Sequence, residues 1–220
     1  MDKISKLILN GYYNGIFPMS NSRIDDSFFF VNPENRAIIP LSKGHISRSL
    51  KRTIIKKNFE IKSNKNFNQV ILSCANPKFG RQNTWINNSI KEIFNTLHES
   101  GYAHSVEIYI NKSLVGGLYG VSIGSVFFAE SMFSAVKNAS KIVLIFLLAK
   151  LNASKFKLFD VQFMTPHLAS MGAIEISKNH FSQCLNLYTK ERNCFPNINS
   201  SRNEDWDILL NYLQETKEIS

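Results

Sequence analysis

The spacing of apolar residues changes abruptly after Gly101, and this change limits the folds that the chain can adopt. Residues 86–97 place their apolar positions at helical spacing, which predicts a helix. Residues 105–110 and 114–121 instead alternate around a short polar turn, which predicts a β-hairpin, and residues 125–133 follow as a further strand. A helix followed by neighbouring strands is typical of an α/β protein rather than a helical bundle.

The rest of the chain adds helices and strands around this hairpin. Residues 67–74 predict a helix that ends before Pro77, residues 139–151 predict a wholly apolar helix, and residues 157–163 predict a buried strand. A last amphipathic helix covers residues 206–213. This order predicts an α/β (α+β) fold, in which a mixed β-sheet has helices packed on both faces.

The first forty residues are irregular and aromatic, with a run of phenylalanines at 28–30. They predict a small N-terminal lobe over residues 1–44, made of a short helix and brief strands, beside a larger domain over residues 45–220. A chain of 220 residues is long enough for one domain with such an appendage. It is too short for a multidomain protein.

Positive charge is concentrated in one part of the chain. The sequence has 26 Lys and Arg against 17 Asp and Glu, and residues 35–91 hold twelve of the cations and one of the acids. Within this block, Arg48, Arg52 and Lys56 share one face of a helix predicted over residues 45–57. Such a strip is typical of a surface that binds a polyanion, and a solvated face without a ligand is the alternative.

Several classes of protein and site are disfavoured by what the sequence lacks. Its three cysteines form no CxxC pair and no Cys/His spacing suited to a metal, and an odd, sparse set is typical of a reducing compartment. The start has no signal-peptide pattern, and the longest apolar run, residues 142–149, is too short to cross a membrane. Common nucleotide-binding, hydrolase and metalloprotease motifs are missing. We therefore expect a cytoplasmic protein with no membrane segment and no bound metal.

Two carboxylates stand out because their neighbours in the sequence are apolar. Glu130 and Asp160 each lie in a predicted strand among aromatic and aliphatic residues. A charge on a buried strand is costly unless it is paired or used in chemistry. In a regular strand Asp160 and Gln162 point to the same face, where both side chains can act on one bound amine or ester. The alternative is that each carboxylate pairs with a nearby backbone group or cation, and the sequence leaves both interpretations open.

Two smaller features also have two interpretations each. The pair Gly116-Gly117 inside a predicted strand indicates either a bulge or a place where a ligand approaches the backbone. Trp85, at the start of the 86–97 helix, is suited either to stacking on a nucleic-acid base or to filling the core.

Short stretches along the chain match one known pattern. The chain resembles the leucyl/phenylalanyl-tRNA–protein transferases, bacterial enzymes of the N-degron pathway. The matching stretches follow the family's order over most of the chain, and they are specific together although each is weak alone. They read Gly15-Ile-Phe-Pro18, Asn35-Arg-Ala37, His45-Ile-Ser-Arg-Ser-Leu-Lys-Arg52, Thr84-Trp-Ile86, Ala103-His-Ser-Val-Glu107, Leu114-Val-Gly-Gly-Leu-Tyr-Gly120, Glu130-Ser-Met-Phe-Ser134, Asn138-Ala-Ser-Lys141, Asp160-Val-Gln162 and His167-Leu-Ala-Ser-Met-Gly-Ala173.

The resemblance implies a fold and a reaction. The larger domain, residues 45–220 including the basic helix 45–57, would be a catalytic domain of the GNAT acetyltransferase type. The enzyme would transfer Leu or Phe, and Met less well, from aminoacyl-tRNA to the α-amino group of proteins that begin with Arg or Lys, which marks them for proteolysis. Because an aminoacyl ester is already activated, no cofactor is expected. The family also implies a monomer.

The resemblance assigns roles to particular residues. Asp160 with Gln162 would draw a proton from the attacking amine or polarise it, and Glu130 would help to hold the substrates. Trp85 would lie near the terminal adenosine of the tRNA. The basic strip would bind the acceptor arm through Arg48, Lys51, Arg52 and Lys56. The aminoacyl side chain would enter an apolar pocket formed by Leu118, Phe127, Met132, Leu147 and Phe159.

The chain departs from the family pattern at a few positions, and two other functions compete. Phe30 and Val31 stand where many members have tryptophans, Ala129 replaces a common glycine, and Phe94 replaces a frequent tyrosine. A GNAT-like acyltransferase that uses acetyl-CoA would need a glycine-rich turn before the helix at 139–151, and no glycine is present there. A tRNA-binding protein without catalytic activity is the third possibility, which the retained polar residues disfavour.

Overall fold

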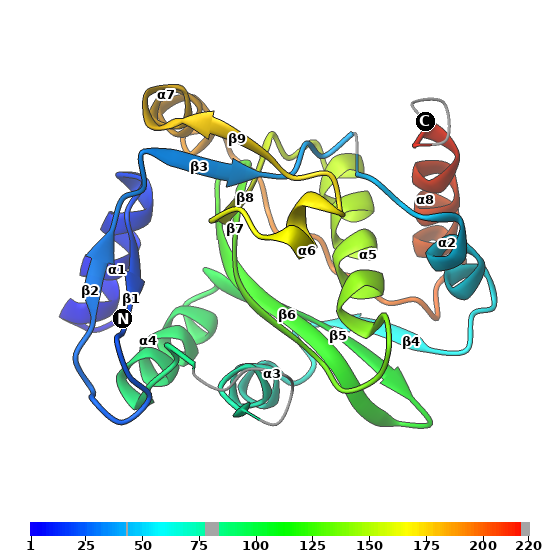
Figure 1. Cartoon of the computed structure of the whole chain (residues 1–220), viewed down its shortest axis with the longest axis horizontal. Helices are drawn as coiled ribbons and strands as arrows, with labels where there is room; N and C mark the ends of the chain where they lie inside the picture. The colour runs from blue at the N-terminus through cyan, green and yellow to red at the C-terminus, as the bar shows by residue number, and fades with distance from the viewer. Residues whose placement is uncertain (43, 78–83, 217–220) are drawn as a thin grey trace.

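A large mixed β-sheet forms the centre of the computed structural model, which describes residues 1–42, 44–77 and 84–216 (Figure 1). Within these residues the strand order is β4-β5-β6-β7-β8-β3-β9. The pair β7–β8 is parallel and its neighbours in the sheet pair antiparallel. The strands are β3 (Asn35–Ile38), β4 (Glu60–Ser63), β5 (Ala103–Ile110), β6 (Ser113–Ile123), β7 (Val126–Ser134), β8 (Leu158–Gln162) and β9 (Ile174–Ser177).

The strands β5, β6 and β7 form the antiparallel meander that the alternating pattern predicts. The turn between β5 and β6 has positive φ at both Asn111 and Lys112, the geometry of the tight turns that match strand twist in hairpins. The register shifts between Ile108 and Tyr109, which leaves Val115 as an extra residue in a bulge near the start of β6. The predicted hairpin is therefore confirmed, with a bulge close to Gly116.

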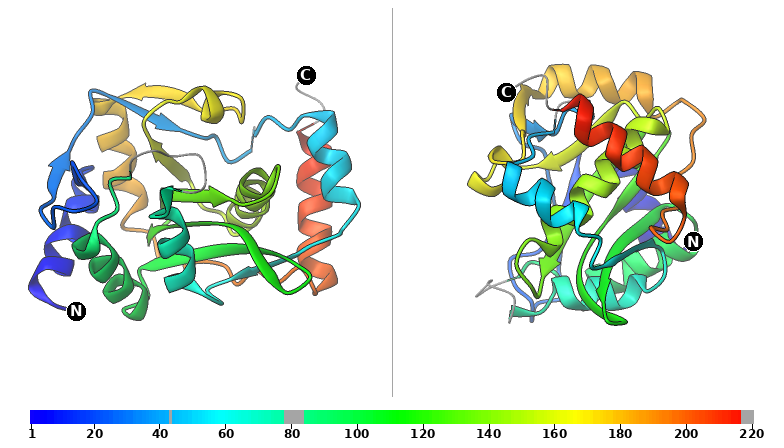
Figure 2. Two further views of the ribbon diagram at one scale, coloured as in Figure 1. Left: turned by 60° about the horizontal axis from the view of Figure 1, so that its bottom comes forward. Right: turned by 90° about the vertical axis from the view of Figure 1, so that its right-hand side faces the viewer.

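Helices cover both faces of this sheet, as predicted (Figures 1 and 2). The helices α3 and α4 pack on one face, and α5 packs on the other with α8 outside it. At the end of the molecule away from α1, the basic helix α2 lies beside α8. Among the described residues no helix combines the length and apolar character needed to cross a bilayer. The helices are α1 (Lys3–Tyr13), α2 (Arg48–Ile55), α3 (Phe67–Cys74), α4 (Asn88–Glu99), α5 (Ala139–Ala153), α6 (Pro166–Ala169), α7 (Lys178–Tyr188) and α8 (Asn203–Glu215).

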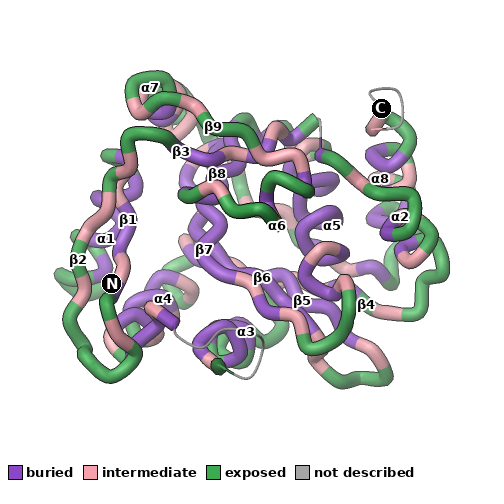
Figure 3. The backbone as a smooth tube through the Cα atoms, viewed as in Figure 1, coloured by how far each residue is buried: buried purple, intermediate pink, exposed green. Residues whose placement is uncertain are grey.

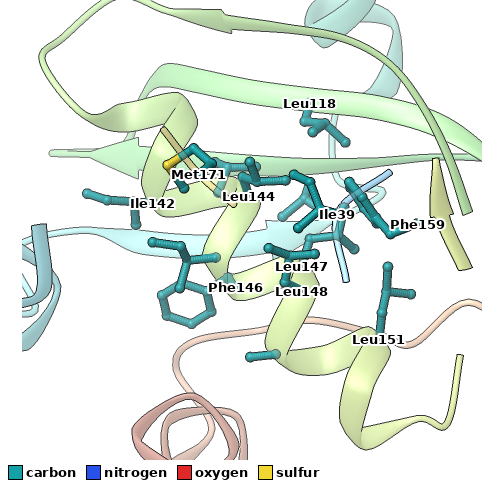
Figure 4. Close-up of a cluster of buried hydrophobic side chains, with 14 of the residues drawn as sticks. Ile39, Leu118, Ile142, Leu144, Phe146, Leu147, Leu148, Leu151, Phe159 and Met171 are labelled. Carbon is teal, nitrogen blue, oxygen red and sulfur yellow. The ribbon is translucent and has the colours of Figure 1, made fainter. Parts of the chain in front are cut away.

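Two apolar clusters fill the molecule, one on each face of the sheet. The first surrounds α5, which is buried on nearly all sides, and includes Leu118 and Phe159 (Figures 3 and 4). The second lies under α3 and α4 and includes Tyr12 of α1 and Phe128 of β7. A helix that is apolar all round needs cover on every side, which explains the uniform composition of residues 142–149.

Gly116 allows α5 to approach the sheet closely. A Cβ atom added at Gly116 would lie 2.7 Å from the Cβ of Ala139 at the start of α5. That distance is shorter than two carbon atoms tolerate, so a larger residue here would push the helix away. The bulge and the close packing of α5 together account for Gly116. At this glycine the structure favours the bulge over the approach of a ligand.

The N-terminal region contributes both a separate small sheet and a strand of the large one. Strands β1 (Phe17–Met19) and β2 (Phe29–Val31) pair only with each other, whereas β3 lies between β8 and β9. The apolar face of α1 belongs to the second cluster. The division at residue 44 stays a prediction, but a lobe that ends there would include a strand of the large sheet, so a structural boundary has to precede β3.

Candidate active site

A cavity lies where β7 and β8 separate. The two strands pair only as far as Phe128 and Asp160; beyond that point β7 pairs with β6 and β8 pairs with β3. The resulting space has a volume of about 440 Å³, within the usual range for small-ligand sites. Its wall is mainly apolar with a polar rim, and consists of Trp85, Leu118, Ala129, Glu130, Ser131, Met132, Phe133, Ser134, Ser140, Val161, Phe163, Thr165, His167 and Leu168.

Glu130, which lines this cavity, lies in a β-bulge. Tyr119 pairs with Ser131 and Gly120 pairs with Ala129, which leaves Glu130 as an extra residue on β7. A bulge locally turns a strand and redirects its side chains. Glu130 faces Tyr12, on the same side of the strand as Phe128 two residues before it. The bulge then shifts the alternation, so that Met132 lies on the opposite face and packs on the first cluster.

Glu130 is buried with one oxygen bonded and one without a partner. Its Oε1 accepts hydrogen bonds from Tyr12 Oη at 2.7 Å and from Gln162 Nε2 at 2.8 Å. Its Oε2 has no hydrogen-bond partner among the described residues. Burial raises the pKa of Glu130 to about 8; the Tyr12 hydrogen bond opposes this rise and the nearby charge of Asp160 adds to it. A carboxyl group that titrates there can take up or release a proton near neutral pH.

Asp160 is fully buried and paired with a cation. Its Oδ1 and Oδ2 accept hydrogen bonds from Arg36 Nε at 2.8 Å and Arg36 Nη2 at 2.6 Å, a bidentate ion pair. Oδ1 also accepts from the backbone N–H of Gln162 at 2.9 Å. Of the two interpretations of this carboxylate, the structure shows the pairing with a cation, and that cation is 124 residues away in the sequence.

Gln162 ends β8 in an unusual backbone conformation. Its φ of 66° lies in the left-handed region, which few residues other than glycine adopt. The N–H bond to Asp160 holds the backbone of Gln162, and its side chain reaches Glu130. Asp160, Gln162 and Glu130 are therefore brought together in one network, joined by Tyr12 and Arg36.

The family model and the relatives found by sequence give one family. The family model described as leucyl/phenylalanyl-tRNA protein transferase matches residues 38–186, well over half of the chain. A protein of that name from Maricaulis maris is 46% identical over 178 residues, which cover 81% of this chain and 82% of the relative. The chain belongs to this family.

Other relatives agree, and solved structures add little. The transferase of Phenylobacterium zucineum is 47% identical over 81% of this chain and 80% of its own length. That of Zymomonas mobilis is 48% identical over 80% of this chain and 65% of its own. Among solved structures, L-PGS from Bacillus licheniformis aligns over 96% of this chain and 71% of its own at 11% identity, with a TM-score of 0.42, which is too weak a likeness to assign a fold or a function.

The residues expected to form the transferase's aminoacyl pocket fall into two groups. Leu118 and Met132 line the cavity. Phe127, Leu147 and Phe159 are fully buried in the first cluster, with the rings of the two phenylalanines stacked at 5.6 Å, and they do not line the cavity. Trp85, expected near the terminal adenosine, also lines it.

The residues at which this chain departs from the family pattern lie away from the cavity wall, except for Ala129. Phe94 is fully buried and packs edge-on against Tyr119, and Phe30 lies in β2 beside the second cluster. Val31 is in the same strand, paired with Phe17. Ala129 lines the cavity next to Glu130.

The basic helix is present, although it is shorter than predicted. Arg48, Arg52 and Lys56 are exposed, while Lys51 is half-buried and donates a hydrogen bond from Nζ to the carbonyl oxygen of Leu213 at 3.0 Å. This contact satisfies a free carbonyl in the last turn of α8. Of the basic residues in the block at 35–91, Lys43, Lys78 and Arg81 lie outside the described residues.

Sequence reasoning missed two residues of the site, Tyr12 and Arg36. Arg36 is the larger omission, because it is a fully buried cation on a strand. Its one signal in the sequence is a lone arginine among apolar residues in 35–39, which requires an acidic partner without naming it. Among the described residues, no group of three or more His, Cys, Asp and Glu side chains is arranged to hold a metal ion.

Proposed function

We propose that this protein transfers Leu or Phe, and Met less well, from aminoacyl-tRNA to the α-amino group of proteins that begin with Arg or Lys. Membership of the family supports this function. The structural observation that carries it is the cavity between β7 and β8, where an apolar wall meets the buried carboxyl group of Glu130. One part of such a site can hold an apolar aminoacyl side chain while the other receives an ammonium group.

The reaction that this site would support is aminolysis of an ester. The substrate's α-ammonium group, whose ordinary pKa is about 8, first loses a proton to become a nucleophile. Its nitrogen then bonds to the aminoacyl carbonyl carbon, and the ester C–O bond to the tRNA ribose breaks with its electron pair staying on oxygen. A second proton leaves the nitrogen and goes to that oxygen. Glu130, Asp160 and Gln162 form the network proposed to serve these proton transfers, and holding two substrates in line supplies much of the remaining acceleration.

The aminoacyl side chain would contact Leu118 and Met132 directly, with Phe127, Leu147 and Phe159 supporting that wall from within the core. The proximity of Trp85 to the same cavity supports a stacking role on the terminal adenosine. Unbranched and γ-branched side chains suit such a wall because they bring apolar surface without crowding the reacting carbonyl.

The acceptor arm of the tRNA would lie along α2. Arg48, Arg52 and Lys56 are spaced one helical turn apart and exposed, so they present a continuous cationic strip to phosphate groups. Lys51 borders the groove between α2 and the end of α8. Phosphate contacts of this kind do not read base sequence.

The protein would act as a monomer in the cytoplasm, where charged tRNA is present, and its product would be marked for N-degron proteolysis. The test is to incubate the protein with leucyl-tRNA and a peptide that begins with Arg, and to detect a peptide extended by one leucine by mass spectrometry. A peptide that begins with Gly is the control. Acetyl transfer from acetyl-CoA instead would favour the GNAT-like alternative, and tRNA binding without any transfer would favour the non-catalytic one.

A further inference from the structure

Arg36 is a buried cation, and each of its three side-chain nitrogens donates a hydrogen bond to a specific acceptor. Its side chain is 1% exposed. Nε and Nη2 bind Asp160, and Nη1 donates to the carbonyl oxygen of Gly15 at 3.0 Å. The guanidinium carbon lies 4.5 Å from the ring centre of Phe17 and 4.6 Å from that of Phe181. Two ring contacts and a bidentate pair restrict the guanidinium group to one orientation.

Asp160, held in this way, has both oxygens bonded to the protein and is closed off from the cavity. Each of its oxygens accepts a hydrogen bond from Arg36, and Oδ1 accepts a further one from the N–H of Gln162. The residue is 0% exposed and does not line the cavity. A group that abstracts a proton has to lie within hydrogen-bond reach of it, directly or through one water. Asp160 is therefore placed to hold the backbone of Gln162 and not to contact the substrate's amine.

The backbone conformation of Gln162 depends on its contact with Asp160. A left-handed backbone conformation is costly for a residue with a side chain and persists only where its surroundings enforce it. The N–H bond to Asp160 holds this conformation together with a bond across Gln162, from the N–H of Phe163 to the carbonyl oxygen of Val161 at 2.8 Å. The resulting turn brings Gln162 Nε2 to Glu130 Oε1. With Tyr12 on the same oxygen, Glu130 is left with a single unpartnered oxygen, Oε2.

We propose that Arg36 is a positioning residue for the transfer reaction: through Asp160 it fixes the left-handed turn of Gln162, which orients Glu130 so that Glu130 Oε2 is the acceptor of the substrate's proton. This inference rests on the proposed function and assigns the proton transfer within it. The α-ammonium nitrogen gives one proton to Glu130 Oε2 and then attacks the ester carbonyl. After the C–O bond breaks, the second proton goes to the leaving ribose oxygen, and Glu130 returns its proton to water.

Two double variants separate this arrangement from one in which the Asp160 carboxylate is itself the base. Arg36→Met with Asp160→Asn removes both buried charges and the carboxylate, but keeps an oxygen that can accept the N–H of Gln162. Arg36→Met with Asp160→Leu removes that oxygen as well. Neither variant leaves an unpaired charge buried, which is the usual reason that breaking such a pair unfolds a protein. If the Leu form does not fold, Asp160→Ala takes its place.

The rate of single turnover and the KM for leucyl-tRNA are measured for each folded variant. We expect the Asn form to stay within about tenfold of the wild-type rate, and the Leu form to fall by about 100-fold or more, with the same KM for leucyl-tRNA in both. An equally large loss in both forms would overturn the proposal, because it would show that the carboxylate of Asp160 is needed. Rates near wild type in both would overturn it too, since the pair would then be purely structural.

If the wild-type protein shows no transfer, that result counts against the proposed function alone. The positioning role of Arg36 can still be tested by a measurement that needs no substrate. The side-chain amide signal of Gln162 in a ¹⁵N NMR spectrum, assigned with Gln162→Met, should be retained in the Asn form and move to a solvent-like position in the Leu form. An unchanged signal in the Leu form would refute the positioning role.

A second buried ion pair in the same protein supplies the matched control. Lys150 Nζ of α5 lies 2.7 Å from Asp205 Oδ1 of α8, with both side chains at least nine-tenths buried, and neither residue lines the cavity. Lys150→Met with Asp205→Leu should keep the rate within about twofold of wild type. A loss as large as that of the Arg36 and Asp160 Leu form would show that removing any buried pair disturbs catalysis, and would overturn the proposal.

Discussion

Tyr12 and Glu130, 118 residues apart in the sequence, share a buried hydrogen bond of 2.7 Å between the phenol oxygen and carboxylate Oε1. The contact ties α1 to the bulge of β7, so the N-terminal region supplies part of the candidate active site. Burial, followed by the charge of Glu130, raises the pKa of Tyr12 well above its ordinary value, so Tyr12 is a hydrogen-bond donor at any physiological pH. Its effect on Glu130 is opposite in sign, because the hydrogen bond stabilises the charged carboxylate.

Replacing Tyr12 by Phe should therefore shift the pH dependence of the reaction upward. Glu130 loses the hydrogen bond that lowers its pKa, so the pKa rises further above about 8, and the half-maximal rate moves to higher pH by roughly one unit. Single-turnover rates from pH 6.5 to 10 measure the shift. The control is Tyr13→Phe, whose partly exposed ring lies outside the network. If the half-maximal pH of Tyr12→Phe equals that of wild type, the pH dependence of the rate comes from the substrate's own amine and not from Glu130.

Glu130 should also make the protein less stable at alkaline pH. Its folded-state pKa of about 8 lies above the ordinary value of 4.5. The stability that this group contributes is thus fully present below about pH 4.5 and is lost as pH rises through about 8. In Glu130→Gln the group no longer titrates. Between pH 5 and pH 9 the free energy of unfolding of wild type should therefore fall by about 2–4 kcal/mol relative to that of the variant.

Urea unfolding of both proteins at pH 5, 7 and 9 gives this difference directly. Glu60→Gln is the matched control, because Glu60 is exposed and its pKa is lowered, first by its hydrogen bond to Lys62. That variant should show no gain with rising pH. A difference between Glu130→Gln and wild type that stays constant from pH 5 to pH 9 would contradict the raised pKa.

Met132 should set amino-acid preference because its side chain lines the cavity. Met132→Ala removes apolar surface that would face the aminoacyl group, which should reduce kcat/KM for leucyl- and phenylalanyl-tRNA by about 10–200-fold and change their ratio. The control is Leu151→Ala, fully buried at the far end of α5, which should lower the free energy of unfolding by about 2–5 kcal/mol and leave the ratio unchanged. Competition assays with both charged tRNAs measure the ratio; if Met132→Ala leaves it at the wild-type value, Met132 is ordinary core.

The strip on α2 should give tRNA affinity a steep dependence on salt. Charge reversal in Arg48→Glu with Arg52→Glu should weaken binding of tRNA of any sequence, and should reduce the slope of log K against log salt by roughly 0.7–0.9 for each phosphate group that the variant no longer binds. Lys157→Glu, at an exposed lysine just before β8, is the control and should leave the slope unchanged. Filter binding between 50 and 300 mM salt is the measurement, and an unaltered slope in the double variant would make the strip a solvated face.

Long elements with a clear period could be predicted from the sequence. The meander of β5, β6 and β7 and the apolar helix α5 follow their patterns closely, because alternation and all-round burial leave a strong signal. The strands β4 and β9 have only four residues each, too few for a period to mark them, and the prediction missed them for that reason. The helix α7 does have apolar residues at helical spacing, at 181, 184, 185 and 188, and the prediction overlooked this signal.

At the site, the sequence indicated the acidic residues but not their partners. Glu130 and Asp160 drew attention because charges among apolar residues require an explanation. No local pattern connects Asp160 with Arg36, since the sheet order that brings β3 beside β8 is decided by packing over the whole chain. The left-handed turn of Gln162 was equally hidden, because glutamine has no preference for that conformation and tertiary contacts impose it.

The contact between Arg36 and Asp160 also bears on the order of events during synthesis. The two residues are separated by 124 positions, and Tyr12 and Glu130 by almost as many. Closing such long loops is entropically costly, so contacts of this kind form late in folding. On the ribosome, the segment with Tyr12 and Arg36 emerges long before residues 130–162, which contain its hydrogen-bond partners. A nascent chain of this protein thus lacks the complete network until Gln162 has emerged, so the N-terminal residues of the candidate site are made long before their partners.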